Sequence, residues 1–389
     1  MMQHTRYLIV GGGLTADGAC KGIREVDPHG TIMLVGQEPH APYSRPPLSK
    51  ALWKGEAENT IWRRTEELGV DLRLGRRIVT LEPQERVATD AEGQWYHYER
   101  LLLATGGRPR RLPFGADVIY FRTLDDFRRL RTLADRGSQF VVIGGGFIGS
   151  EIAAALALNG CPVTMVFPEP GIAARIFPAE LSAALNDYYR SRGVELLPGA
   201  SVAGIERDRI TLGDGRTLEA DAVVAGIGIE PNVELAADAG LPTMNGIVVD
   251  ALGRVGGRAD VFAAGDVARF PVPALGGDLR VEHEDHAKSH GRRVGANMAG
   301  AAEPYDHLPF FYSDLFDLGY EAVGELDSRL QTIVELGELG DEGLVYYLDD
   351  DDRPRGVLLW NLFGHVDEAR ELIQAGQPIT AGAFAERAA

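Results

Sequence analysis

The chain has 389 residues, which is too long for one compact core and typical of two or three domains. Its composition, 45% hydrophobic and 25% charged, is that of a soluble globular protein. The formal net charge of −18 argues against nonspecific binding to nucleic acid or anionic lipid, because like charges repel. The two cysteines, Cys20 and Cys161, have neither zinc-site nor redox-pair spacing and are expected as buried thiols.

No apolar run reaches the roughly 18 residues that a membrane-spanning helix needs. The first periodic segment begins near Arg6, which leaves no room for a signal or transit peptide. We therefore expect no membrane span and a cytoplasmic location.

The first elements in the chain are a strand, a glycine turn, a helix and a second strand. RYLIV at Arg6–Val10 predicts the first strand, Gly11 to Gly13 the turn, and the helix-compatible stretch runs to about Val26. The same order returns at residues 140–167, which predicts an internal duplication. Each copy is followed by a hairpin and an apolar strand, and Asp214-Gly215 is a tight-turn signal in the second.

Alternating strands and helices predict a parallel sheet in each copy, and the hairpins predict a small antiparallel meander packed on it. After the second copy, the apolar strand Val261 to Ala264 ends at Gly265-Asp266. A third region with strand-like stretches begins near Pro309. Within it, the acidic run Asp349 to Asp352 is expected as a solvated hairpin turn.

The second copy carries the glycine fingerprint Gly144-x-Gly146-x-x-Gly149 between a predicted strand and a predicted helix. Such glycines let the backbone approach a pyrophosphate, and the helix N-terminus supplies free N–H groups. The acid expected about 20 residues further on is Glu169, placed to accept from a ribose 2′-OH. A carboxylate there repels a 2′-phosphate, so NADH is predicted over NADPH, although Arg175 is close enough in sequence to soften the preference.

The first copy reads Gly11-x-Gly13-x-x-Ala16, and its second strand ends at Gln37 and Glu38, either of which is a candidate ribose partner. Two such sites in one protein indicate one resident and one diffusible dinucleotide. FAD with NAD(P)H is the usual pair.

Several long strings carry a resemblance to a known family. They are APYSRPPLSK (41–50), LLATGGRPR (102–110), GGGFIGSE (144–151), AGDVARF (264–270), RVEHEDHAKSHGRRVGANMAG (280–300) and YSDLFDLGYEAVGELDS (312–328). With them the chain resembles, nearly end to end, the FAD-dependent pyridine-nucleotide reductases of the ferredoxin-reductase type, and within these apoptosis-inducing factor and its bacterial relatives. The resemblance implies an α/β fold with two Rossmann-like domains of the glutathione-reductase type and an α+β C-terminal domain. The corresponding boundaries are 1–110 with 243–308 for FAD, 111–242 for NAD(P)H, and 309–389 for the C-terminal domain.

The resemblance also implies which residues bind the cofactors. The implied FAD contacts are Gly11, Gly12, Gly13, Leu14, Thr15, Gln37 or Glu38, Arg45, Lys50, Ile78, Arg122, Asp266, Glu282, His283 and Tyr312. The implied NADH contacts are Gly145, Gly146, Phe147, Ile148, Glu151, Glu169, Arg175, Gly228, Glu321 and Asn361. Two positions depart from the family pattern, since Gln37 stands where relatives often carry an acid and Tyr312 where apoptosis-inducing factor has a tryptophan.

Two residues are the candidate catalytic pair. Glu151, two residues after Gly149, is placed to meet the nicotinamide carboxamide, and Lys50 resembles a family lysine that pairs with this glutamate near the reactive end of the flavin. A positive charge there would stabilise a reduced, anionic flavin. The cluster Glu282 to His286 does not have the spacing of known zinc motifs, so no metal site is predicted.

Without a redox cysteine pair, electrons are expected to leave the flavin directly, to a ferredoxin- or rubredoxin-type carrier or to a quinone or oxygen. The net acidity slightly disfavours an acidic ferredoxin, although a local patch with Arg292 and Arg293 opposes it. The alternative hypothesis is a slow NADH sensor that signals by conformational change or by NADH-dependent homodimerisation.

Overall fold

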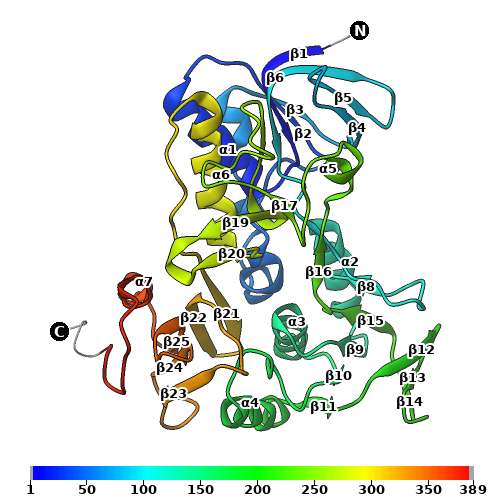
Figure 1. Ribbon diagram of the computed structural model, residues 1–389. Coiled ribbons are helices and arrows are strands. Elements are labelled where there is room, and N and C mark those ends of the chain that lie inside the picture. Colours follow the sequence, from blue (N-terminus) through cyan, green and yellow to red (C-terminus); the bar gives the residue numbers. More distant parts are fainter. Residues whose placement is uncertain (1–2, 385–389) are drawn as a thin grey trace. The chain divides into compact units, whose positions relative to one another are not determined.

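The computed structural model describes residues 3–384 (Figure 1). The chain divides into two compact units, each built from three stretches of sequence. The first unit comprises Met1–Ser44, Glu58–Arg108 and Glu230–Pro309, and the second comprises Arg45–Ala57, Pro109–Ile229 and Phe310–Ala389. The chain changes unit after residues 44, 57, 108, 229 and 309. Two of these changes fall within the paired strands β7 (Gly107–Pro109) and β16 (Ile229–Pro231). The predicted FAD, NAD(P)H and C-terminal domains are defined by the cofactor that each part would bind, and this division remains a prediction.

The first unit is built on a seven-stranded sheet with the order β3-β2-β1-β6-β5-β4, in which β18 also pairs with β6. β1, β2, β3, β6 and β18 run parallel, whereas β4, β5 and β6 form the predicted antiparallel meander. The strands are β1 (Gln3–Val10), β2 (Ile32–Val35), β3 (Val70–Arg73), β4 (Ile78–Glu82), β5 (Val87–Asp90), β6 (Trp95–Leu103) and β18 (Val261–Ala263). The smaller sheet of this unit joins β17 (Ile247–Val248), β19 (Ala268–Val272) and β20 (Gly277–Leu279).

Strand β1 begins three residues before the predicted start at Arg6. Its first residues pair only with β6, whereas the pairing with β2 starts at Tyr7. A segment paired on one side is half exposed and need not be apolar, so Gln3 to Thr5 gave no strand signal in the sequence.

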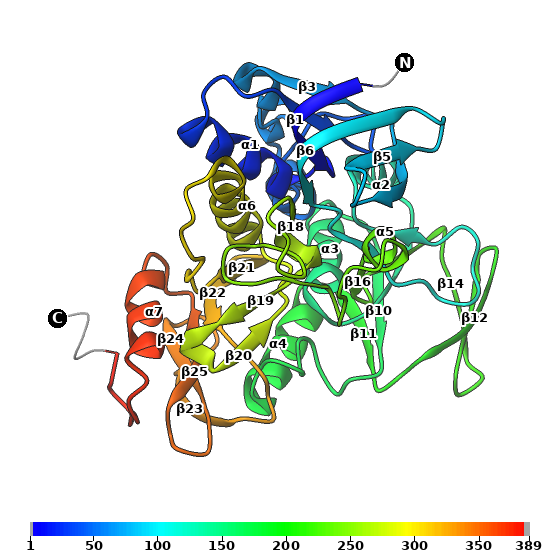
Figure 2. The same ribbon diagram turned by 45° about the horizontal axis from the view of Figure 1, so that its top comes forward.

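The helices of the first unit are α1 (Leu14–Val26), α5 (Glu234–Asp238) and α6 (Glu284–Ala299), and α1 lies against α6 (Figures 1 and 2). Glycines let the two backbones meet. A Cβ on Gly22 would overlap the carbonyl oxygen of Arg292, and a Cβ on Gly295 would overlap that of Ala19. The two helices thus cross so closely that only glycine, which has no Cβ atom, fits at these positions.

The second unit holds a five-stranded, fully parallel sheet with the order β11-β10-β9-β15-β8. Its strands are β8 (Ile119–Tyr120), β9 (Phe140–Ile143), β10 (Val163–Phe167), β11 (Val194–Pro198) and β15 (Ala222–Ala225). Its helices are α2 (Leu124–Ala134), α3 (Phe147–Leu158) and α4 (Ala179–Ser191), and its meander is β12 (Val202–Glu206), β13 (Arg209–Leu212) and β14 (Thr217–Glu219). The turn between β13 and β14 falls at the predicted Asp214-Gly215, where Gly215 has φ +90°.

The C-terminal part of the second unit is an antiparallel sheet with the order β21-β22-β25-β24-β23. Its elements are β21 (Phe310–Leu315), β22 (Leu318–Gly324), β23 (Gln331–Glu335), β24 (Gly343–Leu348), β25 (Pro354–Trp360) and helix α7 (Val366–Ala375). The run Asp349 to Asp352 joins β24 to β25, which confirms the predicted hairpin turn. Both duplicated copies have the predicted order of strand, glycine turn, helix and strand, so the predicted fold class is confirmed.

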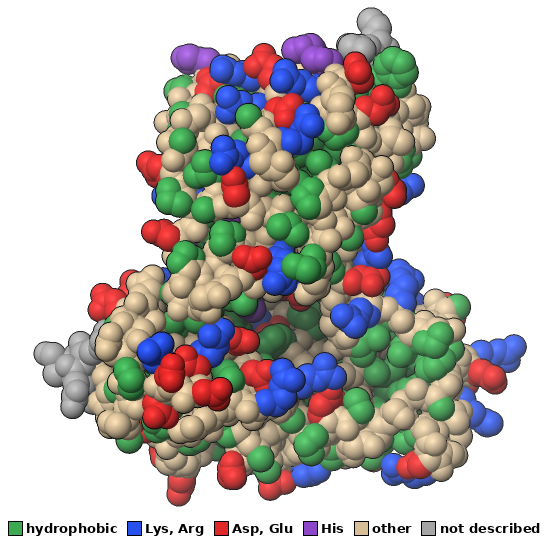
Figure 3. All heavy atoms as spheres, in the orientation of Figure 1, with side chains coloured by type: hydrophobic (Ala, Val, Ile, Leu, Met, Phe, Trp, Pro, Cys, Tyr) green, Lys and Arg blue, Asp and Glu red, His purple; other side chains and the backbone are tan. Residues whose placement is uncertain are grey.

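On the face drawn in Figure 3, acidic and basic side chains are interspersed among apolar ones. Both cysteines are free and buried, as expected. Within residues 3–384, no helix is long and apolar enough to cross a membrane.

Candidate functional site

The first fingerprint lies where β1 ends and α1 begins. Gly11 has φ +133°, and a Cβ there would overlap the carbonyl oxygen of Ala104, so the turn requires glycine. Gly13 is the N-cap of α1 and makes no side-chain cap, and a Cβ on it would meet no atom within 4 Å. The N-terminus of α1 therefore has no side-chain cap and has free space beside its N-cap residue, which fits the pyrophosphate of a dinucleotide.

The Gly265-Asp266 turn lies against this fingerprint. A Cβ on Gly265, which has φ +73°, would overlap the hydroxyl oxygen of Thr15 in the first turn of α1. The side chains of Leu14 and Thr15 are buried, and Asp266 is partly exposed. The structure thus brings the aspartate predicted for the ribityl chain close to the residues predicted for the pyrophosphate, and both features fit FAD.

The two candidates for the ribose contact differ in their surroundings. Gln37 is exposed, whereas Glu38 is partly buried and its Oε2 accepts a hydrogen bond of 2.6 Å from the hydroxyl of Tyr43. Tyr43 therefore orients the Glu38 carboxylate, which makes Glu38 the better-ordered candidate. Ile78 is buried at the start of β4.

Glu282 and His283 precede helix α6, of which His283 is the N-cap residue. The side chain of Glu282 forms an ion pair of 2.8 Å with Arg280. Burial lowers the pKa of the His283 imidazole to about 4, so this ring is neutral at pH 7.

The second fingerprint uses each of its glycines differently. Gly144 has φ +110° and a Cβ there would overlap the carbonyl oxygen of Gly226, whereas a Cβ on Gly149 would overlap that of Gly144. Gly146 is the N-cap of α3 without a side-chain cap, and a Cβ on it would meet no atom within 4 Å. The turn, the close helix packing and the open N-terminus are the three features of a dinucleotide-binding motif. Gly145 lies against the Phe167 ring.

Two apolar side chains at the start of α3 are unusually exposed, Phe147 at 39% and Ile148 at 37%. Both are predicted NADH contacts, and their exposure leaves apolar surface for a ligand ring to cover.

Glu169 follows β10 and its carboxylate forms an ion pair of 2.5 Å with Arg175. The side chain of Glu169 is 21% exposed and that of Arg175 is 83% exposed, so the acid is mostly covered while the arginine lies mostly in solvent. Gly228, another predicted NADH contact, has φ +89° and its carbonyl accepts from the backbone N–H of Arg110 at 3.0 Å.

The candidate catalytic pair is present and buried within the second unit. The ammonium of Lys50 lies 2.6 Å from Oε1 of Glu151, and their side chains are 10% and 3% exposed. Two hydroxyls complete the surroundings of this carboxylate, since Ser313 donates to Oε1 and Ser49 to Oε2, each at 2.6 Å. A buried charge needs such compensation, and Glu151 has three donors within its own unit.

Tyr312 lies beside this pair, and the predicted residues Glu321 and Asn361 lie on or next to the same C-terminal sheet. The ammonium of Lys50 lies 5.1 Å from the ring centroid of Tyr312, which is a cation–π distance. Tyr312 on β21 is paired with Glu321 on β22, whose Oε2 accepts from the N–H of Gly364 at 3.0 Å. Asn361 has φ +49°, and its Oδ1 accepts from the Gly319 N–H.

Arg45 and Arg122 meet through one hydrogen bond of 2.8 Å, from the Arg45 guanidinium to the Arg122 carbonyl. Sequence reasoning named Arg45 and Arg122 as separate FAD contacts and Lys50 and Glu151 as a pair, but missed Ser49 and Ser313. Their only sequence signal is position, because each is the direct neighbour of a predicted residue, Lys50 or Tyr312.

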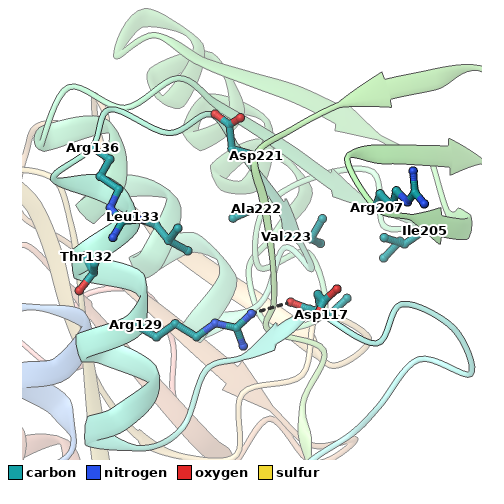
Figure 4. Close-up of a pocket in the computed structure, with 11 residues that line it drawn as sticks. Asp117, Arg129, Thr132, Leu133, Arg136, Ile205, Arg207, Asp221, Ala222 and Val223 are labelled. Atoms are coloured by element: carbon teal, nitrogen blue, oxygen red, sulfur yellow. Dashed lines mark hydrogen bonds between the residues drawn. The ribbon is translucent and has the colours of Figure 1, made fainter.

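A cavity of about 370 Å³ in the second unit lies apart from these residues (Figure 4). It is lined at the amino end of β15 by Asp221, Ala222 and Val223, with Arg129 opposite. The second fingerprint packs on Gly226, just past the carboxyl end of β15. In parallel sheets of this kind dinucleotides bind at the carboxyl ends of the strands, so this cavity is not part of the predicted NADH site.

Comparison with known proteins identifies the family. Residues 5–291 match the model of the pyridine nucleotide-disulphide oxidoreductases. The chain belongs to this family. Residues 294–337 match the C-terminal domain model of mitochondrion-associated apoptosis-inducing factor. The resemblance drawn from the sequence is thereby confirmed, and this oxidoreductase uses FAD and NAD(P)H, as the family does.

Individual relatives agree with this assignment. The chain is 36% identical to the ferredoxin–NAD(+) reductase component of an anthranilate 1,2-dioxygenase system from Burkholderia cepacia, over 96% of this chain and 95% of that protein. It is 33% identical to mitochondrial apoptosis-inducing factor 1 from Dictyostelium discoideum, over 96% of this chain and 79% of that protein. Among solved structures it is similar to a ferredoxin reductase from Rhodopseudomonas palustris, with TM-score 0.90, 31% identity, and coverage of 99% of this chain and 100% of that one.

Proposed function

We propose that this oxidoreductase transfers a hydride from NADH to FAD and passes the electrons to a small carrier protein of the ferredoxin or rubredoxin type. The observation that carries the proposal is the buried Lys50–Glu151 ion pair, with Glu151 on the helix that the second fingerprint opens. FAD, when bound, accepts two electrons as a hydride and can release them one at a time.

In this proposal the side chains of the pair have separate tasks. Glu151 has one oxygen shared by Lys50 and Ser313 and the other bonded to Ser49, and its remaining lone pairs are available to the amide of a nicotinamide. Lys50 supplies a fixed positive charge, which stabilises negative charge developing on the acceptor during hydride transfer. Neither residue has to move a proton.

Two observations support a direct exit of electrons to an external acceptor. The chain has only two cysteines, and burial raises the pKa of Cys20 to about 12, so its thiol does not supply the thiolate that disulfide exchange requires. The relative from Burkholderia cepacia, matched over nearly its full length, is named for the reduction partner ferredoxin. We extend this class of acceptor to the present chain.

The local basic patch considered in the sequence is neutralised by ion pairs. Arg292 lies 2.7 Å from a Glu25 oxygen, and Arg293 pairs with Glu303. A strongly acidic carrier therefore gains little from these two arginines.

The stated preference for NADH rests on Glu169. Its carboxylate, 21% exposed, accepts from a ribose 2′-OH but repels a 2′-phosphate. We expect kcat/KM to be higher for NADH than for NADPH, and Glu169→Ala to shift this ratio toward NADPH by about tenfold or more, since Arg175 is then free to meet the phosphate. Arg175→Ala should leave the wild-type preference in place. A wild-type preference for NADPH would contradict this part of the proposal.

Anaerobic stopped-flow reduction tests the proposed function. NADH is expected to reduce the flavin rapidly, and the reduced protein should then deliver electrons faster to a ferredoxin or rubredoxin than to a quinone or oxygen. Slow reduction with a long-lived charge-transfer band and a change in molecular size would favour the sensor hypothesis instead. A purified protein that NADH does not reduce would overturn both.

Variants of Lys50, Glu151 and Lys54 test whether the Lys50–Glu151 ion pair takes part in flavin reduction. Lys50→Ala and Glu151→Gln should each slow flavin reduction by about 10²-fold, because each removes a charge-assisted contact from the site. Lys54→Ala is the matched control, since this lysine four residues away is 49% exposed and forms an ion pair with Asp314 at 3.5 Å. Lys54→Ala should reduce at the wild-type rate, and equal losses in Lys50→Ala and Lys54→Ala would remove Lys50 from the mechanism.

A further inference from the structure

Three polar rings are buried together in the first unit, although none belongs to the predicted site. His286 and His290 lie one turn apart on α6 and are 0% and 1% exposed, and Tyr305 follows the helix and is 5% exposed. Phe270 of β19 stacks on His286 with a centroid distance of 4.4 Å, and Tyr305 stacks on His290 at 4.5 Å. Most buried polar side-chain atoms are hydrogen-bonded, so the partners of these ring nitrogens and of the hydroxyl need to be identified.

A chain of hydrogen bonds connects these rings to the Gly265-Asp266 turn. The backbone N–H of Gly265 donates to Nδ1 of His290 at 3.3 Å. The same Nδ1 lies 3.3 Å from Nε2 of His286, and Nδ1 of His286 lies 3.1 Å from the hydroxyl of Tyr305. The hydroxyl of Tyr305 is in turn 2.9 Å from that of Ser289.

The backbone N–H of Gly265 determines which atom donates in each hydrogen bond of this series. A backbone N–H only donates, so Nδ1 of His290 carries no proton and its proton is on Nε2. His286 must then donate from Nε2, which leaves its own Nδ1 as the acceptor for the Tyr305 hydroxyl. Both imidazoles are therefore neutral and each is held in the Nε2–H tautomer.

The electrostatics agree with this assignment. Burial lowers the pKa of His290 to about 3, and burial together with the neighbouring His290 lowers that of His286 well below its ordinary value. Protonation of His290 would place a hydrogen on Nδ1, facing the Gly265 N–H, and would break the hydrogen bond between them.

The Gly265-Asp266 turn is also restrained by its contact with α1. Gly265 has φ +73°, and its α-carbon lies against Thr15 so closely that a Cβ would overlap the threonine hydroxyl. Thr15 thus restrains the turn from α1, and His290 restrains its N–H from α6. The next residue is Asp266, whose orientation depends on this turn.

We propose that His290, oriented by His286 and Tyr305, is a positioning residue that fixes the Gly265-Asp266 turn and thereby presents Asp266 to the ribityl chain of FAD. This inference rests on the proposed function only in taking FAD as the ligand of the first unit. The proposed role requires no contact between His290 and the ligand. His290 acts by accepting the hydrogen bond from the Gly265 N–H at Nδ1, which it does as the Nε2–H tautomer.

Amide variants of His290 test this role. Asparagine places an acceptor where Nδ1 lies, whereas glutamine places it near Nε2, so His290→Asn should keep the bond from Gly265 and His290→Gln should lose it. We expect His290→Gln to raise the Kd of the apoprotein for FAD by about tenfold, because the Gly265 N–H loses its partner. His290→Asn should stay within about threefold of wild type. His29→Leu, at an exposed histidine of the same unit, is the control and should bind FAD as wild type does.

Two measurements separate positioning from mere packing. Nitrogen-15 NMR of the histidine rings should show His286 and His290 as Nε2–H tautomers in the apoprotein. Flavin fluorescence titration of each variant should show the loss of affinity without an equal loss of thermal stability. Equal FAD affinity in wild type and His290→Gln, equal weakening by both amide variants, or an Nδ1–H tautomer at His290 would overturn the inference. A wild-type apoprotein that binds no FAD would instead overturn the proposed function, and this inference with it.

Discussion

Glu151 is the most heavily bonded carboxylate of the second unit's candidate site, and Ser313 is the donor that reaches it from the greatest distance in sequence. Ser313 and Lys50 share Oε1, each at 2.6 Å, while Ser49 holds Oε2. Hydrogen bonds to a charged group contribute about 1.5–3 kcal/mol each. Ser313 therefore helps to fix the carboxylate for its partner.

Removing this donor should weaken the site without removing either charge. We expect Ser313→Ala to slow flavin reduction by NADH by about 10- to 100-fold, the kinetic equivalent of one charged hydrogen bond. Single-turnover stopped flow measures the rate. Ser313→Thr retains the hydroxyl and should recover most of it, whereas an unchanged rate in Ser313→Ala would show that Lys50 and Ser49 suffice to hold Glu151.

The sequence predicted the charged members of this site but not their hydroxyl partners. Lys50 and Glu151 were found because the strings around them resemble a family in which both are functional. The bond from Ser313 to Glu151 spans 162 residues, and serine has no periodicity or spacing that indicates such a partner. The Arg175–Glu169 ion pair was not predicted, because Arg175 was noted only as close enough in sequence to soften the preference for NADH.

At the scale of elements, the crossing of α1 and α6 depends on glycine. A Cβ on Gly22 would overlap the carbonyl oxygen of Arg292. A Cβ on Gly18 would lie 2.6 Å from the carbonyl oxygen of Lys288. Backbone cannot yield as a flexible side chain does, so the helices would have to separate.

We expect Gly22→Ala to destabilise the protein by about 2–4 kcal/mol, although alanine favours an isolated helix by about 1 kcal/mol. Urea unfolding measures the difference. Gly277→Ala in β20 is the control, because a Cβ there meets no atom within 4 Å, and it should change the free energy of unfolding by less than about 1 kcal/mol. An equal effect of the two substitutions would show that the crossing can relax.

Elements with local signals were predicted well, and those without were not. The two fingerprints were recognised because an apolar strand, a glycine turn and a helix follow one another within about thirty residues. Helix α6 gave no helical pattern, because its buried positions include His286, His290 and Asn297 rather than apolar residues alone. Its burial is stabilised by hydrogen bonds and by the close crossing with α1, neither of which has a periodic signature.

At the scale of the whole molecule, the duplication predicted from the sequence matches the observed sheets, but the grouping of segments into units did not follow from it. Residues 45–57, which contain the RPPLSK string, belong to the same compact unit as the second fingerprint. Nothing in their composition indicates this, because the grouping depends on contacts with segments about 100 residues away, such as the one from Ser49 to Glu151.

Acid should destabilise the molecule through its buried histidines. The pKa of His290 is lowered to about 3 in the folded state, whereas an unfolded histidine titrates near 6.5. The unfolded chain therefore binds more protons between these values, so the stabilisation is complete above about pH 6.5 and is lost as the pH falls toward 3. At pH 5 the loss is about 2 kcal/mol for His290, and His286, whose pKa is also lowered, adds to it.

The net charge of −18 acts in the opposite direction, because protonating exposed carboxylates relieves their mutual repulsion as the pH approaches 5. The decisive measurement is therefore the difference between wild type and His290→Asn, which has the same carboxylates and one titrating ring fewer. Between pH 7.5 and pH 5, the free energy of unfolding of the variant, obtained from urea titrations, should fall by about 2 kcal/mol less than that of wild type. Parallel curves for the two proteins would mean that His290 is protonated in the folded state at pH 5, and the bond from the Gly265 N–H would not survive at that pH.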